Sequence, residues 1–168
     1  MRGDYLRIIS IDFKRTLVNK ILDWHELKTV VDSLKANGKK IVFTNGCFDI
    51  IHVGHIRYLR QAKELGDVLV IGLNSDKSVS LIKPNRPINP QNHRAEVLSS
   101  LAIVDYVTLF DEETPYELIK LVQPDVLVKG GDWKTEEIVG SDIAKETHSL
   151  PYIEGVSTSG IIEKIKRL

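Results

Sequence analysis

Residues 41–66, IVFTNGCFDIIHVGHIRYLRQAKELG, contain the pattern that decides the fold. They begin with a short apolar run, Ile41–Thr44, pass through a loop, and continue as an amphipathic segment, His55–Leu65, that stops at Gly66. A β-branched run without polar alternation indicates a strand covered on both faces, and glycine commonly ends a helix. The stretch therefore predicts a strand, a loop and a helix in succession.

The same alternation recurs along the chain. Further apolar runs stand at Val68–Leu73, Val104–Phe110 and Asp125–Val128. Strands that alternate with helices predict an α/β fold, here a Rossmann-like, doubly wound parallel sheet of about five strands. The other helices expected in this part of the chain cover Asn92–Ala102, a segment opened by a capping box at Thr114–Glu117, Thr135–Thr147 and Thr158–Leu168.

Residues 1–37 are expected to form an N-terminal extension ahead of the main domain, residues 38–168. Asp23 and Glu26 can cap a helix that runs to Asn37, with Gly38 just past its end. The apolar run Leu6–Phe13 resembles a strand without an identifiable partner. The extension is therefore a candidate edge strand or oligomer contact, and an interaction module is one alternative role for it.

Composition narrows the class of protein. Lys plus Arg and Asp plus Glu both number 23, and this balance argues against an extended nucleic-acid interface. Cys47 is the only cysteine, so neither an internal disulfide nor a zinc site built on several thiolates is possible. No apolar run approaches the roughly 20 residues that span a bilayer, and the first residues do not read as a signal peptide. We therefore expect a cytoplasmic protein without a membrane partner.

The loop after the first strand carries the most informative residues. His52 and His55 are three positions apart, so at a helix start they project from nearly the same face. Helix N-termini offer free N–H groups to phosphate, and two imidazoles add donors for a charged transition state. Gly54 between them removes a side chain where a phosphate needs room. The alternatives are an incidental histidine pair or half of a metal site with Asp49 and Cys47.

At this point GCFDIIHVGH, residues 46–55, resembles the G-x-F-D-x-x-H-x-G-H signature of the cytidylyltransferase-like nucleotidyltransferases. The resemblance covers about residues 38–168, and within the superfamily the likeness is to the heptose 1-phosphate adenylyltransferases. The stretches that suggest it are TNGCFDIIHVGH (44–55), GLNSD (72–76), RPINP (86–90), VDYV (104–107), FDEETP (110–115), VKGGDW (128–133) and EGVSTSGII (154–162).

The resemblance implies roles for individual residues. Catalysis would fall to cationic and imidazole groups that contact phosphates, namely His52, His55, Lys83 and Arg94. The nucleotide would contact backbone, glycines and a hydroxyl-rich turn, made of Cys47, Phe48, Gly54, Gly130, Gly131, Asp132, Gly155, Ser157, Thr158 and Ser159. The second substrate would contact Asn45, Asp49, Asn74 and Arg86. No protein-bound metal is implied, and Mg²⁺ would arrive with ATP.

Several of these residues have plainer interpretations. Lys83 and Arg86 stand in the turn-rich segment KPNRPINP, residues 83–90, and charged loop residues are usually solvated. Asp49 can organise a loop by accepting backbone N–H groups, and we favour that role over one near the chemistry. Ser157 to Ser159 can simply cap the last helix. Trp133 is either a wall against which the base stacks or a packing residue.

The chain departs from the rival glycerol-3-phosphate cytidylyltransferases. Tyr152 stands where those enzymes carry an arginine, and Asp111 and Glu112 stand where they carry a substrate-binding lysine. Acidic side chains there suit sugar hydroxyls. Against the heptose enzymes, Trp133 replaces a more frequent tyrosine and Ser159 a threonine.

The resemblance thus implies transfer of AMP from ATP to heptose 1-phosphate, giving ADP-heptose for lipopolysaccharide. The expected partners are ATP, the sugar phosphate and a second copy in a homodimer. Because about 37 residues precede the transferase, the sugar kinase that many such enzymes carry is expected to be a separate protein. The alternatives are a cytidylyltransferase acting on a polyol phosphate and a non-catalytic nucleotide sensor on the same fold.

Overall fold

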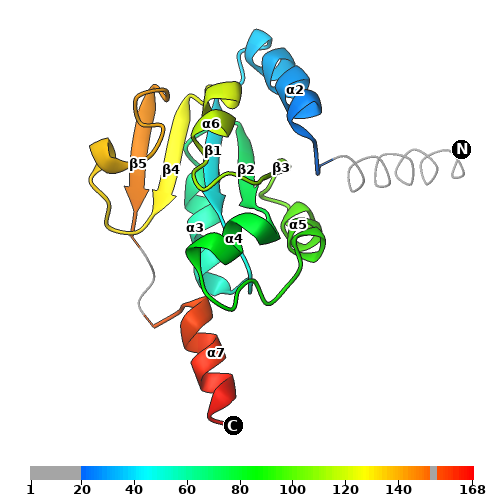
Figure 1. Cartoon of the computed structure of the whole chain (residues 1–168). Coiled ribbons are helices and arrows are strands. Elements are labelled where there is room, and N and C mark those ends of the chain that lie inside the picture. Colours follow the sequence, from blue (N-terminus) through cyan, green and yellow to red (C-terminus); the bar gives the residue numbers. More distant parts are fainter. Residues whose placement is uncertain (1–19, 152–154) are drawn as a thin grey trace, which may run out of the picture.

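Within residues 20–151 and 155–168, the part of the chain that the computed structural model describes, five parallel strands form a sheet in the order β3-β2-β1-β4-β5 (Figure 1). Helices cover both faces, so the predicted α/β fold is confirmed. The strands are β1 (Ile41–Gly46), β2 (Val68–Asn74), β3 (Tyr106–Phe110), β4 (Val126–Gly130) and β5 (Glu146–Leu150). The helices are α2 (Trp24–Ala36), α3 (Val53–Lys63), α4 (Asp76–Ile82), α5 (Gln91–Ser99), α6 (Tyr116–Val122) and α7 (Thr158–Lys166), with a 3-10 turn, η1 (Thr135–Glu137).

The order of the strands creates a switch point beside β1. The chain proceeds from β1 to β2 and β3 at one edge, then returns to place β4 and β5 on the other side of β1. Val42 of β1 accordingly pairs with Leu69 of β2 and with Val126 of β4. In open parallel sheets, the crevice outside the carboxyl ends of the strands at such a point is where ligands bind.

The side chains of β1 alternate between two hydrophobic cores. Val42 packs with Leu59 of α3 on one face of the sheet, in a core that α5 also joins. Ile41 and Phe43 pack on the other face with Leu27 of α2, together with side chains of α6. Both cores contain side chains with no solvent exposure, so the sheet is buried on both faces and its carboxyl edge is held rigidly.

Helix α2 belongs to this same body. The Asp23–Glu26 capping box is present as predicted, and Leu27 and Val31 are fully buried. The Trp24 indole donates to the carbonyl of Leu109 at 2.8 Å. The predicted boundary at residue 37 therefore does not coincide with a break in packing, and the run Leu6–Phe13 lies outside the described residues.

The predicted helix Thr135–Thr147 is wrong. Only the short turn η1 forms at its start, and its end belongs to strand β5, whose Glu146 pairs with Val126 of β4. Gly140 explains the break, because its φ is +89° and an added Cβ would lie 2.7 Å from Ile119. Pairing with β4 then outweighs the weak local helix preference of a polar edge strand.

The start of α6 also differs from the prediction. The helix begins at Tyr116 after an N-cap residue, Pro115, and no side chain caps it, so the capping box expected from Thr114 is absent. Conversely, helix α4 was not predicted, although Ser75 caps it by accepting a hydrogen bond from the amide of Ser78. Its seven residues place Lys83, the C-cap, beside the carboxyl edge of the sheet.

Helix α7 projects from the body, and none of its residues is buried (Figure 1). Its N-terminus nevertheless lies against the loop after β1, since the Thr158 hydroxyl donates to the carbonyl of Ile50 at 3.3 Å. Among the helices of the described part of the chain, none is long and apolar enough to cross a membrane.

Candidate functional site

A cavity of about 900 Å³ opens at the carboxyl edge of the sheet, beyond the ends of β1 and β4. Its walls come from the loop after β1, the start of α3, the end of α4, the end of β4 and the start of α7. All of the predicted site residues line it except Gly131, Asp132 and Arg94. Its volume is that of a pocket for a small-molecule ligand or cofactor.

His52 and His55 form the most distinctive feature of the cavity. Their rings stack at a centroid distance of 3.9 Å and an interplanar angle of 23°. The Nδ1 atoms of both rings are buried without a hydrogen-bond partner in the described structure. His52 is the N-cap of α3 and its side chain caps no amide, so the first turn of the helix keeps free N–H groups. These groups together suit an anion.

The electrostatics of the pair follow from burial. Burial lowers the pKa of His55 to about 4, with further contributions from His52 and Lys83. The pKa of His52 is lowered as well, again by burial. Both imidazoles are therefore neutral at pH 7 in the unliganded protein. An anion placed between them and Lys83 would reverse part of that shift, because a negative charge favours the protonated ring.

Gly54 and Phe48 lie directly against the histidine pair. A Cβ at Gly54 would lie 2.9 Å from two ring atoms of His52, so the imidazole fills the space that the sequence suggested was left for a phosphate. Phe48 adopts a left-handed backbone with φ +43°, and its ring lies 5.2 Å from that of His55. Such backbone strain in a non-glycine residue is tolerated where the surroundings hold a functional geometry.

Asp49 organises the segment 83–90, as we favoured from the sequence. Its buried carboxylate accepts the backbone N–H groups of Ile88 and Asn89 at 2.8 Å each and Nε of Arg86 at 2.5 Å. Burial opposes ionisation, but these donors prevail and lower the pKa of Asp49. Arg86 also lines the cavity, so one ion pair connects the loop after β1 with the segment that follows α4.

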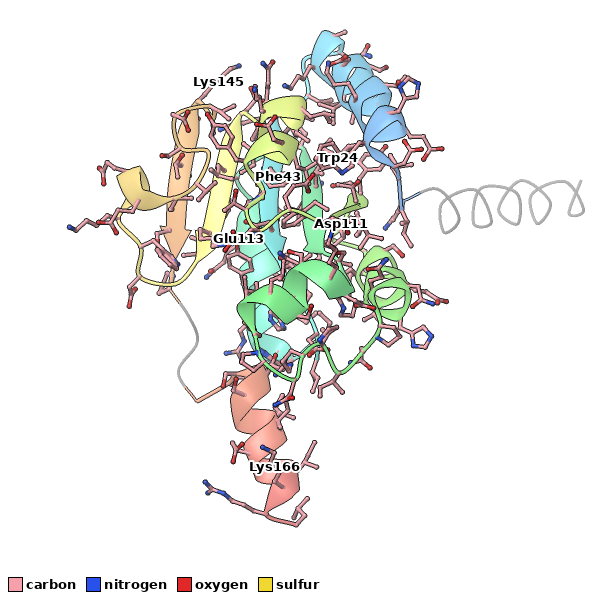
Figure 2. All side chains as sticks on the ribbon, viewed as in Figure 1. Trp24, Phe43, Asp111, Glu113, Lys145 and Lys166 are labelled. Atoms are coloured by element: carbon pink, nitrogen blue, oxygen red, sulfur yellow. The ribbon has the colours of Figure 1, made fainter. Side chains whose placement is uncertain are left out.

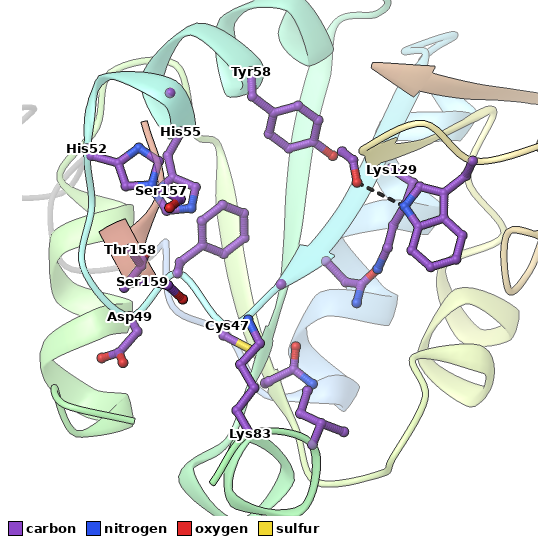
Figure 3. A pocket seen from close by; sticks show the side chains of 18 of the residues that line it. Cys47, Asp49, His52, His55, Tyr58, Lys83, Lys129, Ser157, Thr158 and Ser159 are labelled. Atoms are coloured by element: carbon purple, nitrogen blue, oxygen red, sulfur yellow. Dashed lines mark hydrogen bonds between the residues drawn. The ribbon is translucent and has the colours of Figure 1, made fainter. Parts of the chain in front are cut away.

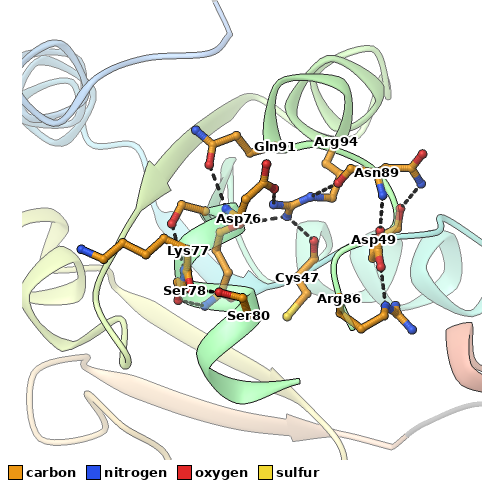
Figure 4. Close-up of polar contacts among 12 residues, drawn as sticks. Cys47, Asp49, Asp76, Lys77, Ser78, Ser80, Arg86, Asn89, Gln91 and Arg94 are labelled. Carbon is orange, nitrogen blue, oxygen red and sulfur yellow. Dashed lines mark hydrogen bonds and ion pairs between the residues drawn. The ribbon is translucent and has the colours of Figure 1, made fainter. Parts of the chain in front are cut away.

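Arg94 does not lie where the sequence suggested. Its side chain is fully buried and bonded on several sides (Figure 4). Nη1 donates to the carbonyls of Cys47 at 2.6 Å and Asn74 at 2.8 Å, Nε donates to Asn89, and Nη2 pairs with Asp76. Because the guanidinium is engaged by the protein and lines no part of the cavity, this geometry does not support direct phosphate contact.

Lys129 is the functional candidate that the sequence prediction missed. It stands at the end of β4 and its side chain lines the cavity opposite His52 and His55, with Lys83 between the two sides (Figure 3). The signal was present in VLVKGG, where a lysine interrupts an apolar run just before the carboxyl edge of the sheet. A charged residue is uncommon in a strand covered on both faces, so its presence there indicates a specific role.

The prediction for the acidic residues after β3 is also corrected by the structure. Asp111 and Glu112, which we expected to suit sugar hydroxyls, do not line the cavity, whereas the next residue, Glu113, does. Figure 2 labels Asp111 and Glu113 in the segment between β3 and α6. Glu137 and Trp133 line the cavity as well. The indole donates to the carbonyl of Gly130 at 3.1 Å and remains half exposed. Carboxylates beside an aromatic face form a lobe suited to a polyhydroxylated ligand.

The remaining predicted residues lie on the cavity wall or just outside it. Ser157 caps α7 by accepting the amide of Gly160 at 3.0 Å, which confirms the simple capping role and leaves its position on the cavity wall. Gly131 lies behind the wall with its N–H bonded to Leu150, and Asp132 is exposed outside it. In the described residues, no group of three His, Cys, Asp or Glu side chains is placed to hold a metal ion.

Comparison with known proteins agrees with this geometry. Residues 43–164 match the family model described as Cytidylyltransferase-like. The chain is 58% identical over 147 residues to the bifunctional protein HldE of Nitratiruptor sp., a match covering 87% of this chain and 32% of that protein. It is 54% identical to HldE of Helicobacter pylori strain J99, over 84% of this chain and 31% of that protein. The chain thus spans about a third of the length of these curated relatives.

Two crystal structures are also similar. The lipopolysaccharide core biosynthesis protein from Thermoplasma volcanium superposes with a TM-score of 0.61 at 31% identity, over 70% of this chain and 100% of that one. Pantoate-β-alanine ligase from Francisella tularensis superposes with a TM-score of 0.56 over 88% of this chain and 78% of that one, and at 16% identity shares the fold alone. The GCFDIIHVGH motif, the family model and these relatives converge, and the chain belongs to the cytidylyltransferase-like family.

Proposed function

We propose that this chain transfers AMP from ATP to a heptose 1-phosphate and releases pyrophosphate, forming ADP-heptose for lipopolysaccharide. The observation that carries the proposal is the stacked pair His52 and His55, with unpartnered Nδ1 atoms at the open N-terminus of α3 and Lys83 on the same cavity. This arrangement places imidazole and ammonium groups where they can contact a phosphate. The HldE relatives and the lipopolysaccharide protein support the choice of pathway.

The reaction follows from in-line displacement. An oxygen of the acceptor phosphate attacks the α-phosphorus of ATP, a new P–O bond forms, and the bond to the β-phosphate breaks as pyrophosphate leaves. The attacking phosphate is already ionised at neutral pH, so no general base is required. His52, His55 and Lys83 neutralise charge and align the phosphates, which is the main requirement of this chemistry.

Arg94 and Asp49 act through the scaffold in this proposal. Arg94 fixes the carbonyls of Cys47 and Asn74, and Asp49 fixes Arg86 and the backbone at Ile88. They hold the loops that carry the contacting groups at the geometry that phosphate transfer needs, because a misplacement of about 1 Å is costly for such reactions.

Mg²⁺ fits this site as an ion that arrives on ATP. The carboxylate of Asp49 already accepts three donors, and no cluster of three ligating side chains stands among the described residues. Mg²⁺ commonly keeps several waters and binds through substrate phosphates. Triphosphate oxygens and water would therefore hold the ion, and it would neutralise the leaving pyrophosphate.

The substrates fit the cavity by chemistry as well as size. Its volume of about 900 Å³ suits a nucleotide with a sugar phosphate. The lobe with Glu113, Trp133 and Glu137 suits sugar hydroxyls and a sugar face. A sugar-phosphorylating activity must supply the acceptor. That the chain forms a homodimer and that it works in the cytoplasm stay predictions.

The test is pyrophosphate release by the purified protein with Mg²⁺. ATP, CTP, GTP and UTP are each combined with heptose 1-phosphate and with glycerol 3-phosphate. Release with ATP and heptose 1-phosphate alone is the expected result. Release with CTP and glycerol 3-phosphate would keep the chemistry and overturn the substrates, while ATP binding without release under any pair would favour a nucleotide sensor.

A further inference from the structure

Lys129 is a cavity-lining cation whose charge the described protein does not balance. Its ammonium group forms no ion pair among the described residues, and its one hydrogen bond, to Oδ1 of Asn45, is long at 3.4 Å. Burial, and the nearby charge of Lys83, lower its pKa, while Cys47 opposes the effect. A partly buried ammonium without a carboxylate is costly, so its retention calls for an anion from outside the protein.

Arg94 provides the contrast within the same chain. Its guanidinium is more deeply buried, yet three backbone carbonyls and Asp76 surround it. The donors of Arg94 are thus used within the protein, and the role of this residue is structural. The ammonium of Lys129 instead faces open cavity at the switch point between β1 and β4, and the Asn45 amide oxygen is its sole acceptor within residues 20–151 and 155–168. The two buried cations therefore have different roles.

The position of Lys129 indicates which phosphate it meets. In-line transfer puts the attacking and leaving groups on opposite sides of the α-phosphorus. His52, His55 and the capped start of α7 lie on one side of the cavity, Lys129 lies on the other, and Lys83 lies between them (Figure 3). If the imidazoles and the helix N-termini hold the leaving pyrophosphate, the acceptor phosphate approaches from the side of Lys129.

We propose that Lys129, assisted by Asn45, binds the acceptor phosphate and thereby selects a phosphorylated sugar over an unphosphorylated one. The inference rests on the proposed function and deepens it. Two polyanions must meet at the α-phosphorus, and a cation on the acceptor side offsets their repulsion. Lys129 is also next to residues proposed to contact the sugar. Its neighbour in β4, Gly130, accepts a hydrogen bond from the indole of Trp133, and both line the cavity.

The test compares Lys129→Met with Lys129→Arg and with Lys120→Met, an exposed lysine on α6 outside the cavity. Lys129→Met keeps the apolar stem and removes the charge. We expect its KM for heptose 1-phosphate to rise about 10- to 100-fold, as for the loss of one charge-assisted hydrogen bond. The KM for ATP should change less than about twofold, Lys129→Arg should recover part of the loss, and Lys120→Met should match the wild type.

Two further measurements keep the inference separate from its rivals. The unfolding temperature of Lys129→Met should equal or exceed that of the wild type, since a merely structural lysine would lower it. A rise confined to the KM for ATP, or unchanged KM values for both substrates, would overturn the assignment.

If the wild type shows no turnover, the proposed function fails. Calorimetric titration of heptose 1-phosphate into the wild type and into Lys129→Met then tests the role of Lys129 separately. Binding that Lys129→Met weakens supports it, and binding that is equal in both proteins, or absent from the wild type, refutes it.

Discussion

At the scale of single residues, the histidine pair concentrates the proposed chemistry. Burial lowers the pKa of His55 to about 4. The ring of His55 stacks on that of His52 and also contacts the ring of Phe48. Both histidines line the cavity beside the uncapped start of α3, and their buried Nδ1 atoms have no hydrogen-bond partner among the described residues. A preorganised donor of this kind contributes most when charge develops in the transition state.

Replacing His55 by alanine should lower turnover about a hundredfold or more, the scale expected when one preorganised transition-state donor is lost. Steady-state pyrophosphate release measures it. His25→Ala, a substitution of an exposed histidine on α2, serves as the matched control and should leave turnover unchanged. Turnover of His55→Ala equal to that of the control would remove His55 from the mechanism.

The pKa of His55 predicts a proton linked to nucleotide binding. In the free protein the pKa is about 4, below the ordinary value of 6.5, so the ring is neutral at pH 5.5. A bound triphosphate raises that pKa, and the ring then takes up a proton. Calorimetric titration of ATP at pH 5.5, in two buffers of different ionisation enthalpy, should show this uptake in the wild type and less of it in His55→Asn.

The same shift gives the sign of a stability effect. Between pH 6.5 and pH 4 the unfolded chain binds a proton at His55 and the folded chain does not, so acidification lowers the free energy of unfolding. Urea unfolding of the unliganded protein at pH 7 and pH 4.5 should show a larger loss for the wild type than for His55→Asn. Equal losses in the two proteins would contradict the low pKa.

Spacing in the sequence predicted that His52 and His55 lie close together, and their stacked rings confirm this proximity. The pair His52 and His55 could be placed because a helix start fixes the direction of both side chains. Arg94 was assigned to phosphate because a helix start can also face a site, but its guanidinium turned inward to backbone carbonyls that are not visible in sequence. Lys129 was missed because the meaning of a lysine at a strand end depends on which strands neighbour it.

At the scale of elements, Arg94 joins several parts of the chain. From α5 it reaches the loop after β1, the end of β2 and the first residue of α4. Lysine can keep the charge at this position but cannot reproduce a planar fork with several fixed donors. The loop geometry around Cys47 and Asp76 therefore depends on arginine itself.

Arg94→Lys should accordingly lower the free energy of unfolding by about 3 kcal/mol, the cost of leaving buried partners unsatisfied. Urea denaturation followed by circular dichroism measures this loss. The exposed Arg60→Lys on α3 is the matched control and should change stability by less than about 0.5 kcal/mol. Full stability of Arg94→Lys with a raised KM for ATP would restore the phosphate contact that the sequence suggested.

Elements were predictable where periodicity and caps agreed. Strands β1 to β4 and helices α2, α3, α5 and α7 followed their apolar patterns, with ends displaced by a few residues. Strand β5 did not, because ETHSL, residues 146–150, is polar and becomes a strand only through its pairing with β4. Helix α4 was overlooked because it is short, though the cap at Ser75 could have revealed it.

At the scale of the whole molecule, the site rests on a sheet buried on both faces. Residues 20–37 contribute to that burial, since Leu27 and Val31 of α2 pack with Phe43 of β1 and Leu118 of α6. The order of the strands then opens one edge of the sheet between β1 and β4. The fold class followed from sequence, whereas the integration of α2 required knowledge of the tertiary packing.

Leu27→Ala should lower the free energy of unfolding by about 3 kcal/mol, within the range for removing a fully buried leucine side chain. Urea unfolding measures it, with far-ultraviolet circular dichroism for the whole fold and the fluorescence of Trp24, recorded with Trp133 replaced by phenylalanine in both proteins. Both probes should report one transition in the wild type and in the variant. A separate early fluorescence transition would show that α2 folds as an independent unit after all.

The central claim is that ATP is cleaved between its α- and β-phosphates and that its AMP part is joined to the phosphate of heptose 1-phosphate. Labelled ATP tests it most directly, with heptose 1-phosphate and Mg²⁺ as the other reactants. Label placed in the α-phosphate should appear in the nucleotide-sugar, and label placed in the γ-phosphate should appear in pyrophosphate. Label from the γ-phosphate in the sugar product, or no transfer of either label, would contradict the account.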